Sequence, residues 1–170
     1  MLYGTMSYVL DKERERVLMI KKFKRENDPN SGLFTLPGGK INDGEMENSH
    51  GKLESAVREC EEETGIKMIN HSIRGQITFL NEERIFDNWD NPEDYYIYLF
   101  STEEYGGTLK AGDEGIPLWI PKKRILDLPK NSGDNIFYEA LLSRDDYFVG
   151  EIKYKGKEVV SEESFVDFIN

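Results

Sequence analysis

The segment Leu53–Thr64 constrains the chain more than any other, because its pattern predicts a helix with a defined end. Its apolar residues recur at helical spacing, and Gly65 follows as a stop signal. With successive residues about 100° apart, Glu59, Glu62 and Glu63 share an arc of about 100°. The chain must therefore bury one side of this helix and gather three carboxylates on the adjacent side.

Local stability does not favour this carboxylate arrangement. Like charges three or four residues apart destabilise a helix by roughly 0.2–0.5 kcal/mol per pair. The helix macrodipole also disfavours anions near the C-terminus. Clustered carboxylate oxygens suit hard cations such as Mg²⁺ or Mn²⁺. A solvated charged face is the alternative interpretation.

A glycine turn precedes this helix. Phe34–Leu36 is predicted as a short strand, and it leads into Pro37-Gly38-Gly39-Lys40. Glycine lets the backbone approach a ligand closely, and the charge of Lys40 suits a phosphate. Taken alone, the same residues also fit an ordinary turn.

The remaining pattern alternates strands with helices, which predicts a mixed α/β layer fold in one domain spanning residues 1–170. Two further helices are predicted, at Pro121–Leu128 and Asp134–Ser143. A hairpin is expected from Tyr147–Tyr154 and Glu158–Val160. The other predicted strands are Leu2–Leu10, Arg16–Lys22, Arg74–Leu80, Tyr95–Ser101, Gly107–Ala111 and Ile116–Ile120.

Composition excludes several classes of protein. Acidic residues outnumber basic ones by 33 to 22, giving a net charge of −11, which argues against binding nucleic-acid polymers or anionic membranes. Cys60 is the single cysteine, so no internal disulfide forms. No apolar run is long enough to span a bilayer and no signal peptide is evident. These observations predict a cytoplasmic protein.

The glycine turn and the helix together form an ordered motif. Five residues separate Gly39 from Glu45, and Arg58 opens the run Arg-Glu-Cys-Glu-Glu-Glu-Thr-Gly-Ile. This order resembles the Nudix box, Gly-x5-Glu-x7-Arg-Glu-U-x-Glu-Glu-x-Gly-U, in which U is a bulky apolar residue. Cys60 and Ile66 take the apolar positions.

One spacing departs from the box. Twelve residues, 46–57, separate Glu45 from Arg58, where the family has seven. We expect Glu45 to keep its position in the loop and Met46–Gly51 to bulge outward. The alternative is that Glu54, four residues before Arg58 on the helix, pairs with the arginine instead.

The resemblance extends over most of the chain, from Leu2 to Val160. Motifs outside the box look like the MutT-type branch, which hydrolyses oxidised purine nucleoside triphosphates. The resemblance implies the Nudix fold, an α/β/α sandwich around a mixed β-sheet. These outer motifs are Arg74–Phe79, Gly107–Leu109, Asp113-Glu114 followed by Leu118–Ile120, and Tyr147–Tyr154.

The resemblance also implies Mg²⁺-dependent chemistry, with Mn²⁺ as an alternative ion. Carried over by position, the metal ligands are the Gly38 carbonyl and the carboxylates of Glu59, Glu62, Glu63 and Glu114. Glu114 is expected to bind metal or activate water. Arg58 is expected to orient the glutamates through charge-assisted hydrogen bonds. Arg58 and the four glutamates are therefore the implied catalytic residues.

The implied reaction is hydrolysis of a nucleoside triphosphate, such as 8-oxo-dGTP, to a monophosphate and pyrophosphate. Hydrolysis of ADP-ribose, a nucleotide sugar or a dinucleotide polyphosphate is the alternative. A non-catalytic nucleotide-sensing module would be expected to lack box glutamates, which this chain keeps. The expected partner is a nucleotide, with no nucleic-acid polymer or membrane, and the expected state is a monomer or homodimer.

Substrate binding is expected at Gly39 and Lys40 for the phosphates, and at Thr35 and Asp134 for the base. Thr35 stands where related hydrolases have Asn. Asp134 also suits a helix N-cap, which is an equally good interpretation. The aromatic candidates for base stacking are Phe23, Phe34, Trp119, Phe137 and the loop residue Trp89.

Overall fold

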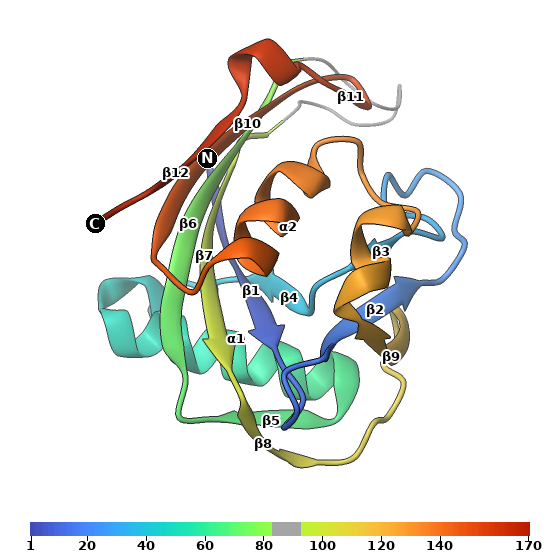
Figure 1. Ribbon diagram of the computed structural model, residues 1–170, viewed down its shortest axis with the longest axis vertical. Coiled ribbons are helices and arrows are strands. Elements are labelled where there is room, and N and C mark those ends of the chain that lie inside the picture. Colours follow the sequence, from blue (N-terminus) through green and yellow to red (C-terminus); the bar gives the residue numbers. More distant parts are fainter. Residues whose placement is uncertain (83–92) are drawn as a thin grey trace.

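The computed structural model describes residues 1–82 and 93–170, whose arrangement is shown in Figure 1. No helix among these residues is both long enough and apolar enough to cross a membrane. The elements follow one another as β1 (Leu2–Val9), β2 (Arg16–Lys22), β3 (Phe34–Thr35), β4 (Gly38–Lys40), the 3₁₀ helix η1 (Glu45–Glu47), α1 (Ser49–Thr64), β5 (Ile66–Ile69), β6 (Ser72–Asn81), β7 (Tyr95–Thr102), β8 (Glu104–Gly107), β9 (Gly115–Pro121), η2 (Lys122–Asp127), α2 (Asp134–Ser143), β10 (Phe148–Lys155), β11 (Glu158–Val159), η3 (Ser161–Glu163) and β12 (Phe165–Phe168).

A mixed sheet of seven strands forms the centre of the fold. Its order is β11-β10-β6-β7-β1-β4, and β12 also pairs with β10. The β1–β7 and β6–β10 pairs are parallel, and the other pairs are antiparallel. Two smaller sheets have the orders β3-β2-β9 and β5-β8. Figure 1 shows α2 between the large sheet and the β3-β2-β9 sheet.

The two α-helices cover opposite faces of the large sheet. Successive side chains of a strand point to opposite faces. In β1, Tyr8 joins the hydrophobic core that contains Phe137 of α2, whereas Val9 joins the core that contains Ala56 and Cys60 of α1. This arrangement confirms the predicted sandwich around a mixed sheet.

Helix α1 begins at Ser49, one turn before the Leu53 that its apolar spacing predicts. The side chain of Asn48 accepts a hydrogen bond from the Gly51 N–H at 2.9 Å and caps the helix. The prediction of an outward bulge at Met46–Gly51 is therefore wrong. These residues complete η1 and form the polar first turn of α1.

Other differences concern short strands whose pairing is set by tertiary structure. Beside β5, the strand is Glu104–Gly107 rather than the predicted Gly107–Ala111. Gly107 ends it with a φ of 86°, a left-handed conformation that glycine adopts readily. Strands β4, β5 and β12 are not predicted from the sequence. By contrast, α2 has the predicted bounds.

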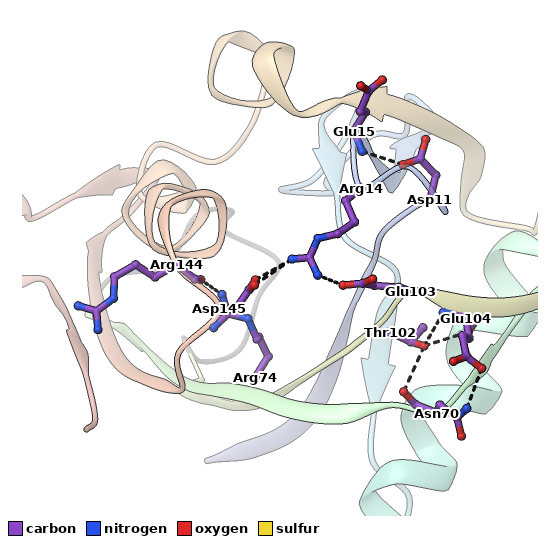
Figure 2. A network of polar contacts seen from close by, with 10 residues as sticks. All are labelled: Asp11, Arg14, Glu15, Asn70, Arg74, Thr102, Glu103, Glu104, Arg144 and Asp145. Atoms are coloured by element: carbon purple, nitrogen blue, oxygen red, sulfur yellow. Dashed lines mark hydrogen bonds and ion pairs between the residues drawn. The ribbon is translucent and has the colours of Figure 1, made fainter.

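Arginine side chains connect several turns of the fold in the network of polar contacts that Figure 2 shows. Arg14, in the turn between β1 and β2, pairs with Glu103 and binds both carboxylate oxygens of Asp145 at 2.9 and 3.0 Å. Buried Arg74 donates to the backbone carbonyls of Arg144 and Asp146. These contacts join the β1–β2 turn, the start of β8 and the α2–β10 connection.

Candidate active site

The last turns of α1 pack against the two glycines of β4. The Gly38 N–H donates a hydrogen bond to Oε2 of Glu63 at 2.8 Å. A Cβ at Gly39 would overlap the Glu59 carboxylate, with even the farther oxygen at only 2.9 Å. Glycine is therefore required at position 39 for the Glu59 carboxylate to occupy this place. The predicted association of the glycine turn with the carboxylate helix is present in the structure.

Arg58 lies among three of the box carboxylates. Its Nη1 is 2.6 Å from Glu59 Oε1 and 3.5 Å from Glu62 Oε2. Its Nε and Nη2 donate to the two oxygens of Glu45 at 3.4 and 3.3 Å. Glu54 pairs with His50 at 3.0 Å instead. Glu45 thus keeps its role beside the arginine despite the longer spacing, and the Glu54 alternative is wrong.

Lys22 is a site residue that the sequence analysis missed. It ends β2, and its ammonium group lies 3.6 Å from Oε1 of Glu63 and also pairs with Glu114. The lysine side chain is only 14% exposed. A lysine at a strand end carries no distinctive sequence signal, so only the tertiary structure reveals this contact.

The two carboxylates beside Lys22 differ in environment. Burial raises the pKa of Glu63 to about 7, although Lys22 and the Gly38 N–H oppose the shift. Glu114 is half-exposed, and the hydrogen bond from Lys22 holds the pKa of its carboxyl below the usual value. The ammonium group of Lys22 therefore favours the charged form of Glu63, whereas burial favours its protonated form.

The donor set fits a hard divalent cation. In the part of the chain that the structure describes, no three acidic, His or Cys side chains converge closely enough to hold an ion. The carboxylates are drawn instead toward cationic side chains: Glu63 and Glu114 toward Lys22, and Glu59 and Glu62 toward Arg58. Carboxylate oxygens are the ligands that Mg²⁺ and Mn²⁺ prefer.

A cavity of about 950 Å³ opens beside the glycine turn. Its wall includes Gly38, Gly39, Thr35 and Asp134. The Thr35 hydroxyl is buried and has no hydrogen-bond partner among the described residues. Lys40 is exposed on β4 and is not among the described residues of the wall. The structure thus brings three of the four predicted substrate-binding residues to one cavity.

Most of the aromatic candidates pack in the hydrophobic cores, and Phe137 both packs there and lines the cavity. Phe137 lines the cavity and meets the ring of Phe79, which also lines it, at 6.2 Å in an edge-on contact. Phe34 and Trp119 pack in the two hydrophobic cores, and Phe23 is exposed. Of the predicted stacking residues that the structure describes, only Phe137 lines the cavity. Trp89 lies outside the described residues.

Asp134 is the first residue of α2 and is 6% exposed. The N-cap position of α2 is held by Gly133, and Asp134 lies just inside the helix, so the N-cap interpretation is wrong. Burial raises the pKa of Asp134 to about 7, against the opposing effects of Lys130 and a hydrogen bond from Tyr154. Burying a carboxyl group costs free energy, so a role in packing alone does not explain an aspartate in this cavity wall.

We expect the Asp134→Asn variant to become more stable relative to the wild type as pH rises. The pKa of an unfolded Asp is about 3.9, whereas burial raises the pKa of Asp134 to about 7. The folded state therefore holds this proton more tightly, and stability is lost as pH rises between these two values. Asparagine does not ionise and escapes this loss.

Between about pH 5 and about pH 8, the wild type should lose roughly 2–3 kcal/mol relative to the variant. Urea denaturation of both proteins at the two pH values measures the difference. A stability gap that does not change with pH would show that Asp134 ionises normally in the folded protein.

The sequence is similar to a known protein family and to two of its relatives. The family described as NUDIX domain matches residues 3–141. A Nudix hydrolase of Bacillus subtilis named YvcI, itself uncharacterised, is 28% identical over 143 residues, covering 82% of this chain and 80% of its own. An ADP-ribose pyrophosphatase of Methanocaldococcus jannaschii is 34% identical over 107 residues, covering 62% of this chain and 53% of its own.

A solved structure agrees with the fold over nearly its whole length. The crystal structure of a mutator MutT protein from Bacillus halodurans superimposes with a TM-score of 0.78. It is 28% identical, and the match covers 98% of both chains. The similarity therefore includes the strands β10, β11 and β12, which lie beyond the residues that the family matches, as well as the region that carries the box.

Proposed function

The chain belongs to the Nudix family of hydrolases and is of the MutT type, and from this premise we propose that it is a Mg²⁺-dependent pyrophosphohydrolase. The proposed reaction converts a nucleoside triphosphate, including oxidised purine nucleotides such as 8-oxo-dGTP, to a monophosphate and pyrophosphate. The observation that carries the proposal is the carboxylate cluster of α1, which lies against Gly38 and Gly39, two glycines that line a large cavity.

Glu59, Glu62, Glu63 and Glu114 would hold the metal, together with the Gly38 carbonyl. Mn²⁺ is an alternative occupant. A bound divalent cation neutralises phosphate charge and activates water. Arg58 fixes the directions of the Glu59 and Glu62 carboxylates through its guanidinium group. Phosphoryl chemistry depends mainly on positioning and charge stabilisation, so a covalent nucleophile is not required.

Lys22 has two roles in this proposal. Its ammonium group holds Glu63 and Glu114 in place before substrate arrives. Because Lys22 also lines the cavity, its charge is available to a phosphate oxygen once the carboxylates take up a metal ion. Gly39 brings the β4 backbone close to the same phosphates, and the nearby Lys40 adds positive charge.

The part of the cavity lined by Thr35, Asp134 and the two phenylalanines Phe79 and Phe137 is proposed to bind the base. Its volume of about 950 Å³ lies near the upper end of the roughly 300–1,000 Å³ range of ligand pockets. Thr35 offers a hydroxyl with no partner in the described part of the chain, and Asp134 offers a buried carboxyl. Phe137 and Phe79 supply apolar ring surface. These groups suit a flat heterocycle with hydrogen-bonding edges.

ADP-ribose is the second candidate substrate. The observation that favours it is the similarity to the archaeal ADP-ribose pyrophosphatase over 107 residues. The same carboxylate cluster would cleave either phosphoanhydride. The choice between them depends on what the cavity beyond the phosphates accepts.

A panel of dGTP, 8-oxo-dGTP, ATP and ADP-ribose with Mg²⁺ separates the two candidates. We expect pyrophosphate and a nucleoside monophosphate from a purine triphosphate, with kcat/KM at least about tenfold above that for ADP-ribose. A preference for ADP-ribose, yielding AMP and ribose phosphate without pyrophosphate, would replace the first candidate with the second. No turnover of any member would refute the proposed reaction.

A further inference from the structure

Tyr154 of β10 lies beside Asp134 in the cavity wall. The tyrosine is only 8% exposed, and both residues line the cavity. Its hydroxyl accepts a hydrogen bond from the Gly133 N–H at 3.0 Å. The same oxygen lies 3.5 Å from Oδ1 of Asp134. The hydroxyl therefore bridges the residue that precedes α2 and the first side chain of that helix.

The donor and the acceptor in each of these two hydrogen bonds can be assigned. A tyrosine hydroxyl has one proton to donate. Because the Gly133 N–H is a donor, the Tyr154 oxygen accepts there, and its own proton is directed to the Asp134 carboxyl. Among the described residues, Oδ2 of Asp134 receives no hydrogen bond from a side chain. The backbone of Asn131 also hydrogen-bonds this carboxyl, so Tyr154 and Asn131 together hold it in the cavity wall.

The backbone is shaped to admit the tyrosine hydroxyl. A Cβ at Gly133 would lie 2.7 Å from the Tyr154 hydroxyl and 2.7 Å from Cγ2 of Ile152. A larger residue at position 133 would push β10 or the hydroxyl away from α2. The absence of a side chain at Gly133 is therefore a condition for the contact between Tyr154 and Asp134.

The other groups facing Asp134 do not replace this contact. Lys130 contributes positive charge, but its ammonium group donates to the carbonyls of Ile125 and Leu128 at 2.6 and 2.8 Å. Tyr138 of α2 is fully buried, and burial raises its pKa well above the usual value, so its hydroxyl stays neutral. Of the side chains that the structure describes around Asp134, Tyr154 is the one that hydrogen-bonds its carboxyl.

We propose that Tyr154 is a positioning residue for substrate recognition, which fixes the Asp134 carboxyl so that it meets the hydrogen-bonding edge of the nucleobase. The inference rests on the proposed function, because it assigns the base to this end of the cavity. Tyr154 acts through Asp134 and lies apart from the α1 carboxylates. Its loss should therefore weaken binding of the base without slowing the chemical step.

The test is a double-mutant cycle of Tyr154→Phe and Asp134→Ala, with KM and kcat measured on the preferred nucleotide of the panel. Tyr154→Phe keeps the ring and removes the hydroxyl. We expect it to raise KM about tenfold, which is typical of losing a hydrogen bond to a charged or ionisable group, with kcat unchanged. In the Asp134→Ala background, the same replacement should change KM less than twofold, because its target is gone.

Tyr96→Phe is the matched control. Tyr96 donates a comparable side-chain hydrogen bond to Gln76 at 2.6 Å, and it does not line the cavity. This control should leave KM and its pH dependence unchanged. Ionisation of Asp134 changes the hydrogen bonds that its carboxyl can make to a base, so KM should change with pH near the pKa of Asp134. In Tyr154→Phe this change should move to higher pH, because the hydrogen bond that lowers the pKa of Asp134 is removed.

Equal and additive effects of Tyr154→Phe in both backgrounds would overturn the inference, since they would indicate a general packing role. A fall in kcat with unchanged KM would also overturn it. Calorimetric binding of the nucleoside monophosphate gives the same cycle without turnover, should any variant lose activity. Failure of the wild type to hydrolyse any nucleotide would refute the proposed function itself, whereas an additive cycle in an active enzyme refutes only the role of Tyr154.

Discussion

Replacing Glu62 and Glu63 together with glutamine is expected to lower Mg²⁺-dependent turnover by about three orders of magnitude or more. Metal-based charge stabilisation supplies several kcal/mol of a phosphoryl-transfer barrier, and about 1.4 kcal/mol corresponds to a factor of ten. Glutamine keeps the shape of each side chain and removes its negative charge. Steady-state kinetics across a range of Mg²⁺ concentrations measures the loss.

The double variant should remain folded. Burial already raises the pKa of Glu63 to about 7, so the fold accepts a neutral side chain at this place. The amide oxygen of glutamine can still accept the Gly38 N–H. Glu61→Gln is the matched control, because Glu61 is an exposed carboxylate on the same helix turn. Turnover in the double variant equal to that of the control would exclude Glu62 and Glu63 from catalysis.

Gly39→Ala is expected to reduce activity by at least about a hundredfold with little loss of stability. The added Cβ overlaps the Glu59 carboxylate, which lies at the end of a flexible side chain and can swing away. The protein therefore accommodates the methyl group by displacing a proposed metal ligand. Loss of one well-placed charge-stabilising group costs roughly 10²–10³ in kcat. Kinetics and thermal unfolding of the same sample measure the two effects.

Alanine substitutions at two other glycines, Gly38 and Gly106, serve as comparisons for Gly39→Ala. At Gly38 a Cβ would overlap the backbone carbonyl of Thr5 in β1, so Gly38→Ala should lower stability because backbone has to move. At Gly106 the nearest atom to an added Cβ is 4.0 Å away, so Gly106→Ala should change neither property. A Gly39→Ala protein that is fully active would show that Glu59 does not need its present position.

The helix that carries the carboxylates is the element that the sequence predicts best. Its apolar spacing locates the buried side, and Gly65 marks the end, where a φ of 76° requires a left-handed residue. Its beginning is less predictable, because the first turn is polar and its start depends on the Asn48 cap. The bounds of α2 are predicted because Ile136, Phe137, Ala140 and Leu141 recur at helical spacing.

Short strands escape prediction for a different reason. β4 consists of Gly38, Gly39 and Lys40, which have low strand propensity, and it exists because it pairs with Gly4–Met6 of β1. β12 contributes four residues at the edge of the sheet, paired with β10. Such elements form through partners that are distant in the chain, so a local pattern carries little signal for them.

Some residues of the candidate site are likewise predicted from the sequence, and others are found only in the structure. The motif predicts Arg58 and the box glutamates of α1, and Arg58 joins Glu59 and Glu62 to Glu45 in the structure. Lys22 and Tyr154 are missed, because an isolated lysine or tyrosine at a strand end has no distinguishing spacing. Their significance comes from burial against Glu63 and Asp134, which only the folded chain brings about.

The proposed reaction is tested most directly by product analysis with ³¹P NMR, using metal-stripped protein and the preferred nucleotide of the panel. We expect no turnover until MgCl₂ is added, followed by cleavage at an internal phosphoanhydride, so that a nucleoside monophosphate and its second phosphate product appear in equal amounts. Turnover at the same rate without a divalent cation, or release of orthophosphate from the terminal phosphate alone, would contradict the account.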